Sequence, residues 1–528
     1  MQLRAASLIA TAVIACTTLV GCGQASNAPG AGSVLRELGT EPTQGFDPNK
    51  AFTSASLVPM AMMYETLTER DDSGKIVGSL AQSWTVSPDG KTYTFTLRQG
   101  VEFSDGSPIT PDDVKYSIER AKAGDVLKSQ LAGISSIETS GSDQVIFTLA
   151  KPMSTFTSLL GRPGSAAILS KKVVEADKNY FTKPTSTSGP WTLSEYTPKS
   201  QMVFTVNKHY YNVPKIGKVV ITFGTDPTAS AAALKSGSVD IAVIGYNDVA
   251  NVKQEGQINI IQSDVIAPLF FGWDRTKAPF DNLKVRQAVS WAVDRTGKQS
   301  ACWYGTGAVT YGNILRPWDP DYVEINAYKA ASRDEALQKA GDLLDEAGWK
   351  VPSSGGTRVA QGVPGVSDGT KLSFSVEYES NWPAAACHVQ LLQQSLKQVG
   401  IDARPRAYDP SAYWGDVPKG KFTMYHGAAS ATDGLDLYEN WFKTGGSLTA
   451  LTTHLNDPAI DAKITEAEEA GPDEAKAIIQ SLERWQAENL PMLIDGYQWP
   501  QVGVSKRVHN YKAGVDVDSR NLVAASLG

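Results

Sequence analysis

The stretch SPDGKTYTFTLRQGVEFSDGSPITPDDV, residues 87–114, carries the clearest structural pattern in the chain. From Thr92 to Leu97, threonine alternates with larger, mainly apolar side chains, and this period of two predicts a half-buried β-strand. Residues Thr110 to Asp113 predict a helix start, because threonine caps helices, proline suits the first turn and acids favour the positive end of the helix dipole. The stretch therefore indicates a fold that combines strands and helices.

Strands and helices alternate along the rest of the chain without an internal repeat. Strands are predicted over Val34–Thr40 and Val145–Leu149 from their apolar pattern. Apolar residues at helical spacing predict helices over Leu57–Thr68, from Asp281 or Asn282 to Arg295, over Asp334–Ala347, over His388–Val399 and over Glu474–Glu488. This alternation predicts an α/β or α+β fold and excludes a solenoid.

The bulk composition is that of a globular protein. The 528 residues are 41% hydrophobic and 20% charged, which predicts a large buried core. At roughly 100–200 residues per domain, the chain is long enough for two to four structural units. The net charge of -7 argues against a nucleic-acid partner, because such a partner requires a clustered basic surface.

The first 22 residues differ in kind from the rest of the chain. Arg4 is their only charge, and the apolar run Ala5–Val20 is shorter than the ~20 residues that span a membrane. We therefore predict a signal peptide over residues 1–22 and a flexible tether over residues 23–32. Leu19-Val20-Gly21-Cys22 resembles a bacterial lipobox, which implies lipidation of Cys22 and anchoring on the extracytoplasmic face of the cell membrane. The alternative is an ordinary secretory signal with an incidental cysteine.

Two cysteines remain for the folded protein once Cys16 is cleaved away and Cys22 is acylated. These are Cys302 and Cys387, and an oxidising compartment permits a disulfide between them. Pairing also requires Cα atoms within about 7 Å of each other, which the sequence does not fix. We expect two buried free thiols in preference to a disulfide.

The sequence has no local motif of a metal site and no convincing motif of a catalytic one. The five histidines stand singly, with no His-x-x-x-His or Glu-x-x-His spacing, and no Cys-x-x-Cys occurs. Gly365-Val366-Ser367-Asp368-Gly369 has the Gly-x-Ser-x-Gly spacing of a hydrolase nucleophile, but it lies in the Gly-, Pro- and Ser-rich stretch 351–369, which predicts a surface loop and not a strand-to-helix turn. We predict that the protein is not an enzyme and holds no metal or cofactor. A secreted hydrolase with scattered catalytic residues is the alternative.

A series of short motifs, in order along the chain, is similar to one protein family. These motifs are Tyr64–Leu67, Gly78–Trp84, Ser87–Phe95, Leu97–Val101, Phe103–Pro108, Asp112–Val114, Ser188–Trp191, Ser236–Ile241, Pro279–Asn282, Val285–Val289, Asp294-Arg295 and Leu343–Gly348. Together they resemble the peptide/nickel-binding family of solute-binding proteins, family 5, which serves ABC importers. Their order and spacing extend over nearly the whole mature chain.

The resemblance implies a two-lobed α/β fold of the periplasmic-binding-protein type, with a hinge and an extra subdomain inserted in the first lobe. We place the first lobe at residues 33–275 and 490–528, the insertion at about 53–186 and the second lobe at 276–489. The implied function is capture of a di- or oligopeptide by hinge closure and delivery to the membrane permease of an ABC importer. We expect a monomer.

In peptide-binding relatives, an aspartate of the second lobe pairs with the free amino group of the peptide. The resembling stretch here is Phe422–Trp441, in which the position itself falls on Thr432 and Asp433 follows. Asp433 is the candidate anchor, and an acid of a surface loop is the alternative. Ala428-Ala429 replaces the glycine–tryptophan pair that usually precedes the aspartate.

Other side chains are expected near the ligand because of where the resemblance places them. Glu41 and Tyr246 would lie on the first lobe, and the aromatic candidates are Phe270, Phe271, Trp273, Trp382, Trp414 and Tyr497. Each aromatic ring has an alternative place in the protein core. Two other ligands stay open: an oligosaccharide, stacked on tryptophans, and a nickel chelate, which His426 would help to hold.

Overall fold

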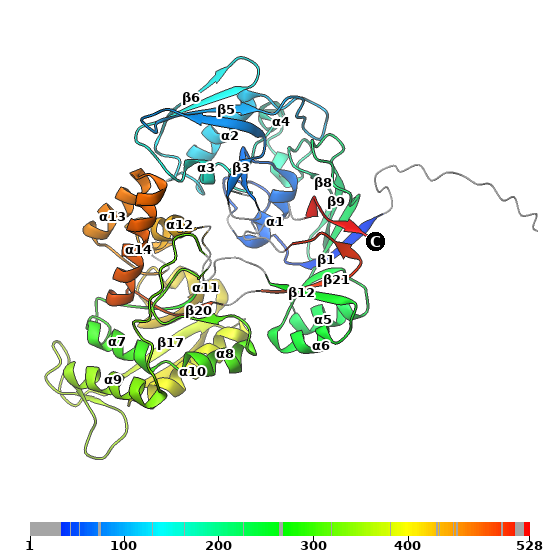
Figure 1. The fold of residues 1–528 in the computed structure, drawn as a ribbon. Coiled ribbons are helices and arrows are strands. Elements are labelled where there is room, and N and C mark those ends of the chain that lie inside the picture. The colour runs from blue at the N-terminus through cyan, green and yellow to red at the C-terminus, as the bar shows by residue number, and fades with distance from the viewer. Residues whose placement is uncertain are drawn as a thin grey trace, which may run out of the picture.

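The computed structural model describes residues 33–528 except residues 43, 52, 72–74, 129, 163, 225, 263–267, 318, 381, 429–430, 432, 447, 450–451, 498–499 and 513–521. Two large sheets, of seven and six strands, organise two lobes, and a smaller four-stranded sheet forms a subdomain. Figure 1 shows the subdomain at the top, the first lobe at the right and the second lobe at the lower left. The predicted signal peptide, tether and Cys22 lie outside the described residues.

The first lobe is built on the seven-stranded sheet. Its strands in spatial order are β12 (Ile258–Gln262), β21 (Gln501–Ser505), β11 (Ile241–Ile244), β1 (Val34–Gly39), β10 (Lys218–Phe223), β9 (Gln201–Val206) and β8 (Trp191–Thr197). β1 runs parallel to both β10 and β11, whereas β21 is antiparallel to β11 and β12. Helices α1 (Ser54–Met63), α5 (Pro227–Lys235), α6 (Val249–Lys253) and the 3-10 helix η2 (Tyr246–Asp248) accompany this sheet.

The inserted subdomain contains the stretch from which the fold was predicted. Its sheet has the order β4 (Ala81–Val86), β5 (Thr92–Leu97), β7 (Gln144–Leu149) and β6 (Ile134–Ser140). β5 buries every second side chain, as its period of two predicted. Helix α2 (Pro111–Ala123) begins at Thr110, which forms a reciprocal capping box with Asp113. The remaining elements are β2 (Thr68–Arg70), β3 (Ile76–Gly78), α3 (Phe156–Leu159), α4 (Lys171–Ala176) and η1 (Tyr180–Thr182).

The second lobe has three layers. Its central sheet has the order β14 (Ala308–Val309), β20 (Leu493–Tyr497), β13 (Pro268–Trp273), β19 (Met424–Ala428), β17 (Ser373–Glu379) and β18 (Asp402–Tyr408). One face packs on α7 (Leu283–Ala292), α9 (Arg333–Glu346) and α10 (Pro383–Lys397). The other packs on α11 (Pro410–Asp416), α12 (Gly434–Trp441), α13 (Pro458–Glu469) and α14 (Pro472–Asn489).

Minor elements complete the described part of the chain. They are α8 (Arg295–Trp303) and the short strands β15 (Trp349–Lys350), β16 (Val359–Ala360), β22 (Val508–His509) and β23 (Ser526–Leu527). No helix of the described residues combines the length and apolar character needed to span a membrane.

Two connections join the lobes side by side. The chain passes from β12 to β13 through residues 263–267, and returns from β20 to β21 through residues 498–500. On the first lobe, Gln262 pairs with Gln501, and on the second, Pro268 pairs with Tyr497. Each connection therefore begins and ends beside the other. β13 and β20 belong to the sheet of the second lobe. The second lobe therefore begins before the predicted residue 276 and ends after the predicted residue 489.

The predicted helices and strands are largely confirmed, with three corrections. The helix predicted over His388–Val399 begins earlier, at Pro383, and ends at Lys397. The helix predicted over Leu57–Thr68 ends at Met63, and the chain turns into β2 at Thr68. The residues between them are buried, and this burial accounts for the apolar pattern that suggested a longer helix. The helix predicted to reach Arg295 ends at Ala292, because Asp294 caps a separate helix, α8.

Candidate functional site at the boundary between the lobes

The carboxyl ends of the parallel strands in the first lobe face the hinge. β1, β10, β11 and β12 all run in one direction, and the chain leaves β12 directly into the first connection. Glu41 follows β1, and Tyr246 follows β11. Ligands of open α/β sheets bind beyond the carboxyl ends of strands, so both residues stand at the favoured edge.

The second lobe presents the matching edge. Pro268 starts β13 at the hinge, and Leu269 pairs with Ala428, which ends β19. β17 and β18 run parallel to β19, so their carboxyl ends lie along the same edge. Trp382, Trp414 and Asp433 each follow one of these three strands. Five of the predicted ligand-binding residues therefore come from segments that adjoin the hinge-side edges of the two sheets.

Trp382 belongs to a partly exposed apolar cluster at this edge. Its ring is half-buried, and its centroid lies 5.0 Å from that of the His426 imidazole. The cluster also contains the fully buried Leu269 and Trp303, and its partly buried members are Val309, Trp382, Cys387, Leu391 and Ala428. An aromatic ring that is packed on one side and open on the other is suited to contact a ligand.

Trp414 packs beside a glycine of the sheet. The ring is half-buried and meets that of Tyr413 edge to face, with centroids 5.1 Å apart. A Cβ atom on Gly427 would lie 2.9 Å from the Trp414 ring and 2.5 Å from that of Phe270. Glycine at position 427 therefore allows Trp414 to lie close against the end of β19.

Four aromatic candidates lie in the core of the second lobe, which corrects our expectation that they face a ligand. Phe270, Phe271, Trp273 and Tyr497 are 0%, 1%, 1% and 2% exposed. The Trp273 Nε1 donates to the carbonyl of Leu490 at 3.1 Å. Tyr497 Oη bonds two carbonyl oxygens within its own lobe. All six residues of β13 are buried, because the strand lies between the two helix layers of the second lobe.

Glu41 has partners within the first lobe. Its Oε1 accepts hydrogen bonds from Tyr196 Oη at 3.1 Å and from the backbone N–H of Lys199 at 2.9 Å. Tyr246 is half-buried at the start of η2. Both residues keep a place at the hinge-side edge, with Glu41 fixed by its two donors.

Asp433, the candidate anchor, is engaged on both carboxylate oxygens. Oδ1 accepts from the backbone N–H of Asp436, which makes Asp433 the N-cap of α12. Oδ2 accepts from Arg70 Nη2 at 2.6 Å. Arg70 ends β2 of the inserted subdomain, 363 positions away, so this ion pair joins the two lobes. No sequence pattern pointed to Arg70, because a pairing over this distance leaves no local signal.

Further polar contacts cross the same boundary between the inserted subdomain and α12–α13, which Figure 1 shows side by side. Arg162 bonds Asp436 at 3.4 Å, and Lys151 bonds Glu469 at 2.8 Å. The contacts also include Gln130 with Asn440, at 3.4 Å, and the Ser154 N–H with the Glu468 carbonyl, at 2.9 Å. The subdomain therefore touches the second lobe directly, away from the hinge.

Acidic side chains outnumber basic ones in the recess between these surfaces. It is lined by Arg70, Gln130, Met153, Thr155, Ser158, Leu159, Gly161, Arg162, Asp433, Asp436 and Glu439. Burial, followed by the charges of Glu468 and Asp436, raises the pKa of Glu439 to about 7. Burial and the neighbouring Asp433 charge raise the pKa of Asp321 to about 6. Burial and neighbouring acids therefore disfavour the ionised forms of Glu439 and Asp321.

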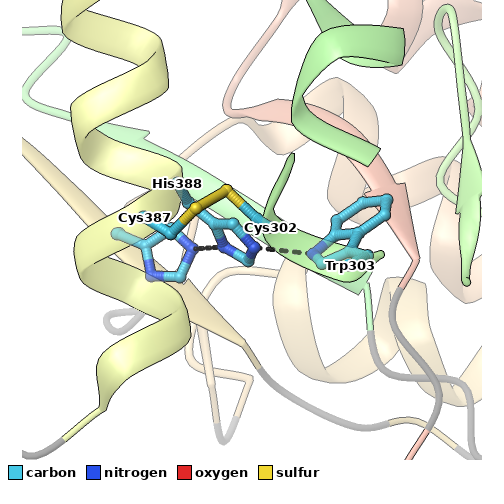
Figure 2. The surroundings of a disulfide bond; sticks show 5 residues. Cys302, Trp303, Cys387 and His388 are labelled. Atoms are coloured by element: carbon cyan, nitrogen blue, oxygen red, sulfur yellow. Dashed lines mark hydrogen bonds between the residues drawn. A yellow bond between two sulfur atoms is a disulfide. The ribbon is translucent and has the colours of Figure 1, made fainter. Parts of the chain in front are cut away.

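A disulfide joins Cys302 and Cys387, so our expectation of two free thiols is wrong. Figure 2 shows the bond between α8 and α10, beside Trp303 and His388. The Cα atoms lie 5.7 Å apart, within the range for bridging. The two residues are 85 positions apart in sequence, and only the packing of the two helices brings them together.

Two buried histidines lie next to the disulfide. Trp303 Nε1 donates to His388 Nε2 at 2.6 Å, and His388 Nδ1 lies 3.0 Å from His426 Nε2. Burial, aided by the charge of Lys298, lowers the pKa of His426 to about 3 and that of His388 well below its usual value. Both rings are therefore neutral. Among the described residues no three or more His, Cys, Asp or Glu side chains gather in a possible metal site.

A buried ion pair completes this part of the second lobe. Lys298 Nζ bonds the carboxylate of Asp495, and the two side chains are 2% and 1% exposed. The ammonium also lies 4.7 Å from the centroid of the Trp303 ring. This pair links α8 to β20 just before the second connection between the lobes.

Comparison with known proteins places the chain in a family. The model of the bacterial extracellular solute-binding proteins, family 5, matches residues 75–449, which is more than half of the chain. The chain belongs to this family. The resemblance stated from the motifs is thereby confirmed.

Individual relatives are more distant. A protein of Brucella ovis, provisionally named an ABC transporter peptide-binding protein, is 29% identical over 362 residues, or 66% of this chain. The chain spans 64% of the length of that relative. The glutathione-binding protein GsiB of Salmonella typhi is 29% identical over 369 residues, covering 69% of this chain and 67% of the relative.

Solved structures share the fold. The oligopeptide-binding protein AppA from Bacillus subtilis, in complex with a nonapeptide, has a TM-score of 0.78 at 21% identity, covering 95% of this chain and all of that one. NikA from Brucella suis, in complex with Fe(III)-EDTA, has a TM-score of 0.82 at 21% identity, covering 94% and 100% of the two chains. These matches confirm the two-lobed α/β fold of the family.

Proposed function

We propose that this protein is the extracytoplasmic solute-binding component of an ABC importer. It captures a di- or oligopeptide between its lobes by hinge closure and passes it unchanged to a membrane permease. Family membership supports the transport role, and a binding protein of this kind is no enzyme. Lipidation of Cys22, attachment to the cell membrane and a monomeric state belong to the same proposal.

One observation carries the proposal most directly. The hinge-side edges of two α/β sheets face each other across a pair of adjacent connections. Such an arrangement lets two rigid lobes rotate about the connections and enclose a molecule at the carboxyl ends of their strands. A ligand shifts the protein toward the closed form by as much as it binds that form better than the open one.

Peptides are the favoured ligand class. The relatives named above include proteins called peptide-binding and glutathione-binding, and one neighbour holds a nonapeptide. A metal chelate is the second candidate, because the NikA neighbour holds one. His426 is a poor direct ligand for such a metal, since it is 2% exposed and its Nε2 already lies 3.0 Å from His388 Nδ1. An oligosaccharide stays the third candidate, through stacking on Trp382 and Trp414.

Trp382 and Trp414 form the proposed aromatic contacts, with Glu41 and Tyr246 opposite them on the first lobe. Truncating a central tryptophan of a binding site weakens binding by about 2 kcal/mol, or about thirty-fold in Kd. We expect this loss for Trp382→Ala, measured by titration calorimetry with a peptide that copurifies with the protein. Trp291→Ala is the matched control, because this half-buried ring packs on α9 and Tyr328, away from the hinge.

Two results would contradict the proposal. Equal affinities of the Trp382→Ala and Trp291→Ala variants would remove Trp382 from the site. Chromatography of the peptide after incubation tests the transport role itself, because cleavage products would indicate the alternative hydrolase. An intact peptide, together with a raised melting temperature of the protein, is the expected outcome.

A further inference from the structure

Asp433 has a partner within the protein that competes with any ligand amine. Arg70 Nη2 donates to Asp433 Oδ2 and to Ser158 Oγ, in each case at 2.6 Å. The second carboxylate oxygen of Asp433 accepts the N-cap bond from Asp436. Each oxygen of the carboxylate therefore already accepts a hydrogen bond within the protein.

The environment of this pair makes replacement by a ligand unfavourable. The side chains of Arg70 and Asp433 are 20% and 23% exposed, so both charges have lost most of their hydration. An ammonium group that bound Asp433 would leave the guanidinium without its carboxylate at a largely dehydrated site. A second cation beside Arg70 would also repel it. Arginine is the stronger competitor, because its charge is permanent and its planar group matches a carboxylate.

We propose that Arg70 takes the place of a ligand ammonium at Asp433, so that the protein does not require a free amino terminus on its peptide. This inference rests on the proposed function. The ligand class is thereby widened to peptides with blocked or cyclic termini and to other solutes without an α-amine. Arg70 acts as a specificity-determining residue, and the Arg70–Asp433 pair closes the lobes over ligands of either kind.

The test compares peptides with free and with acetylated amino termini. The probe is an equimolar library of tri- to pentapeptides and its N-acetylated counterpart, measured by native mass spectrometry and calorimetry. The wild-type protein should bind matched pairs within about threefold of each other. Arg70→Gln should open Asp433 to the ammonium and favour the free peptides at least tenfold. Arg162→Gln, which removes the neighbouring pair with Asp436, should leave the ratio near one.

A second variant keeps the test decisive if Arg70→Gln folds poorly. Asp433→Asn should change the affinities for free and acetylated peptides by the same factor, because it removes only a contact between the lobes. Selective loss of the free peptides in this variant, or a tenfold preference for them in the wild-type protein, would overturn the inference and leave the proposed function intact. A wild-type protein that binds neither library would overturn both.

Discussion

Removal of the Cys302–Cys387 disulfide should lower the stability of the second lobe by a calculable amount. The bond closes a loop with a sequence separation of 85. The loss of chain entropy in the unfolded state for a loop of this length corresponds to a stabilisation of about 4.6 kcal/mol at room temperature. Measured values for native disulfides extend from about 2 to about 5 kcal/mol, so the calculated figure is an upper estimate.

The assay is denaturant unfolding followed by tryptophan fluorescence. The double variant Cys302→Ala/Cys387→Ala should unfold at a lower denaturant concentration than the wild-type protein. Reductant should lower the wild-type midpoint by a similar amount and leave the variant unchanged. Two titratable thiols in unfolded, unreduced wild-type protein would refute the disulfide. An unchanged midpoint in the variant would refute the entropy argument.

Three other predictions concern charged groups. Asp495→Asn should lower the free energy of unfolding by about 3–5 kcal/mol, because Lys298 stays buried without its partner, and Lys298→Met/Asp495→Leu should recover much of the loss in the same unfolding assay. The pKa of His426 is lowered from 6.5 to about 3 by burial and by the charge of Lys298, so only the unfolded chain gains this proton in mild acid. The free energy of unfolding is therefore highest above about pH 6.5 and should fall by about 1.4 kcal/mol per pH unit as the pH is lowered toward 3. His426→Gln should reduce this dependence on pH. Burial raises the pKa of Glu439 from 4.5 to about 7, so the folded protein binds a proton there that the unfolded chain does not, and the free energy of unfolding should rise as the pH falls from about 7 to 4.5, a rise that Glu439→Gln should lack in the same unfolding assay.

Local sequence patterns predicted the helices and strands of this fold better than they predicted which residues pack against one another. The alternation over Thr92–Leu97 and the capping box at Thr110 each depend on neighbours in sequence, and the structure has both features. Three of the aromatic candidates, Phe270, Phe271 and Trp273, lie on the buried strand β13. Its side chains were assigned to the ligand because a buried strand and a binding surface are equally rich in aromatic residues.

The contacts that define the candidate site depend on long-range packing. Arg70 and Asp433 are 363 positions apart, and the two cysteines are 85 positions apart. The local patterns of a single sequence carry no information on contacts between such distant residues. The disulfide was therefore judged wrongly, and Arg70 was not considered. The family motifs supplied the order of the lobes, which no local pattern could have given.

The two connections between the lobes restrict how the protein can open. They leave each sheet from directly paired residues, Gln262 with Gln501 and Pro268 with Tyr497. Because the lobes are joined at two neighbouring points, they can change their relative orientation mainly by rotating about the line through these points. We therefore expect the lobes to open and close by a hinge rotation about a single axis. Each return swing would bring Arg70 back to the same carboxylate.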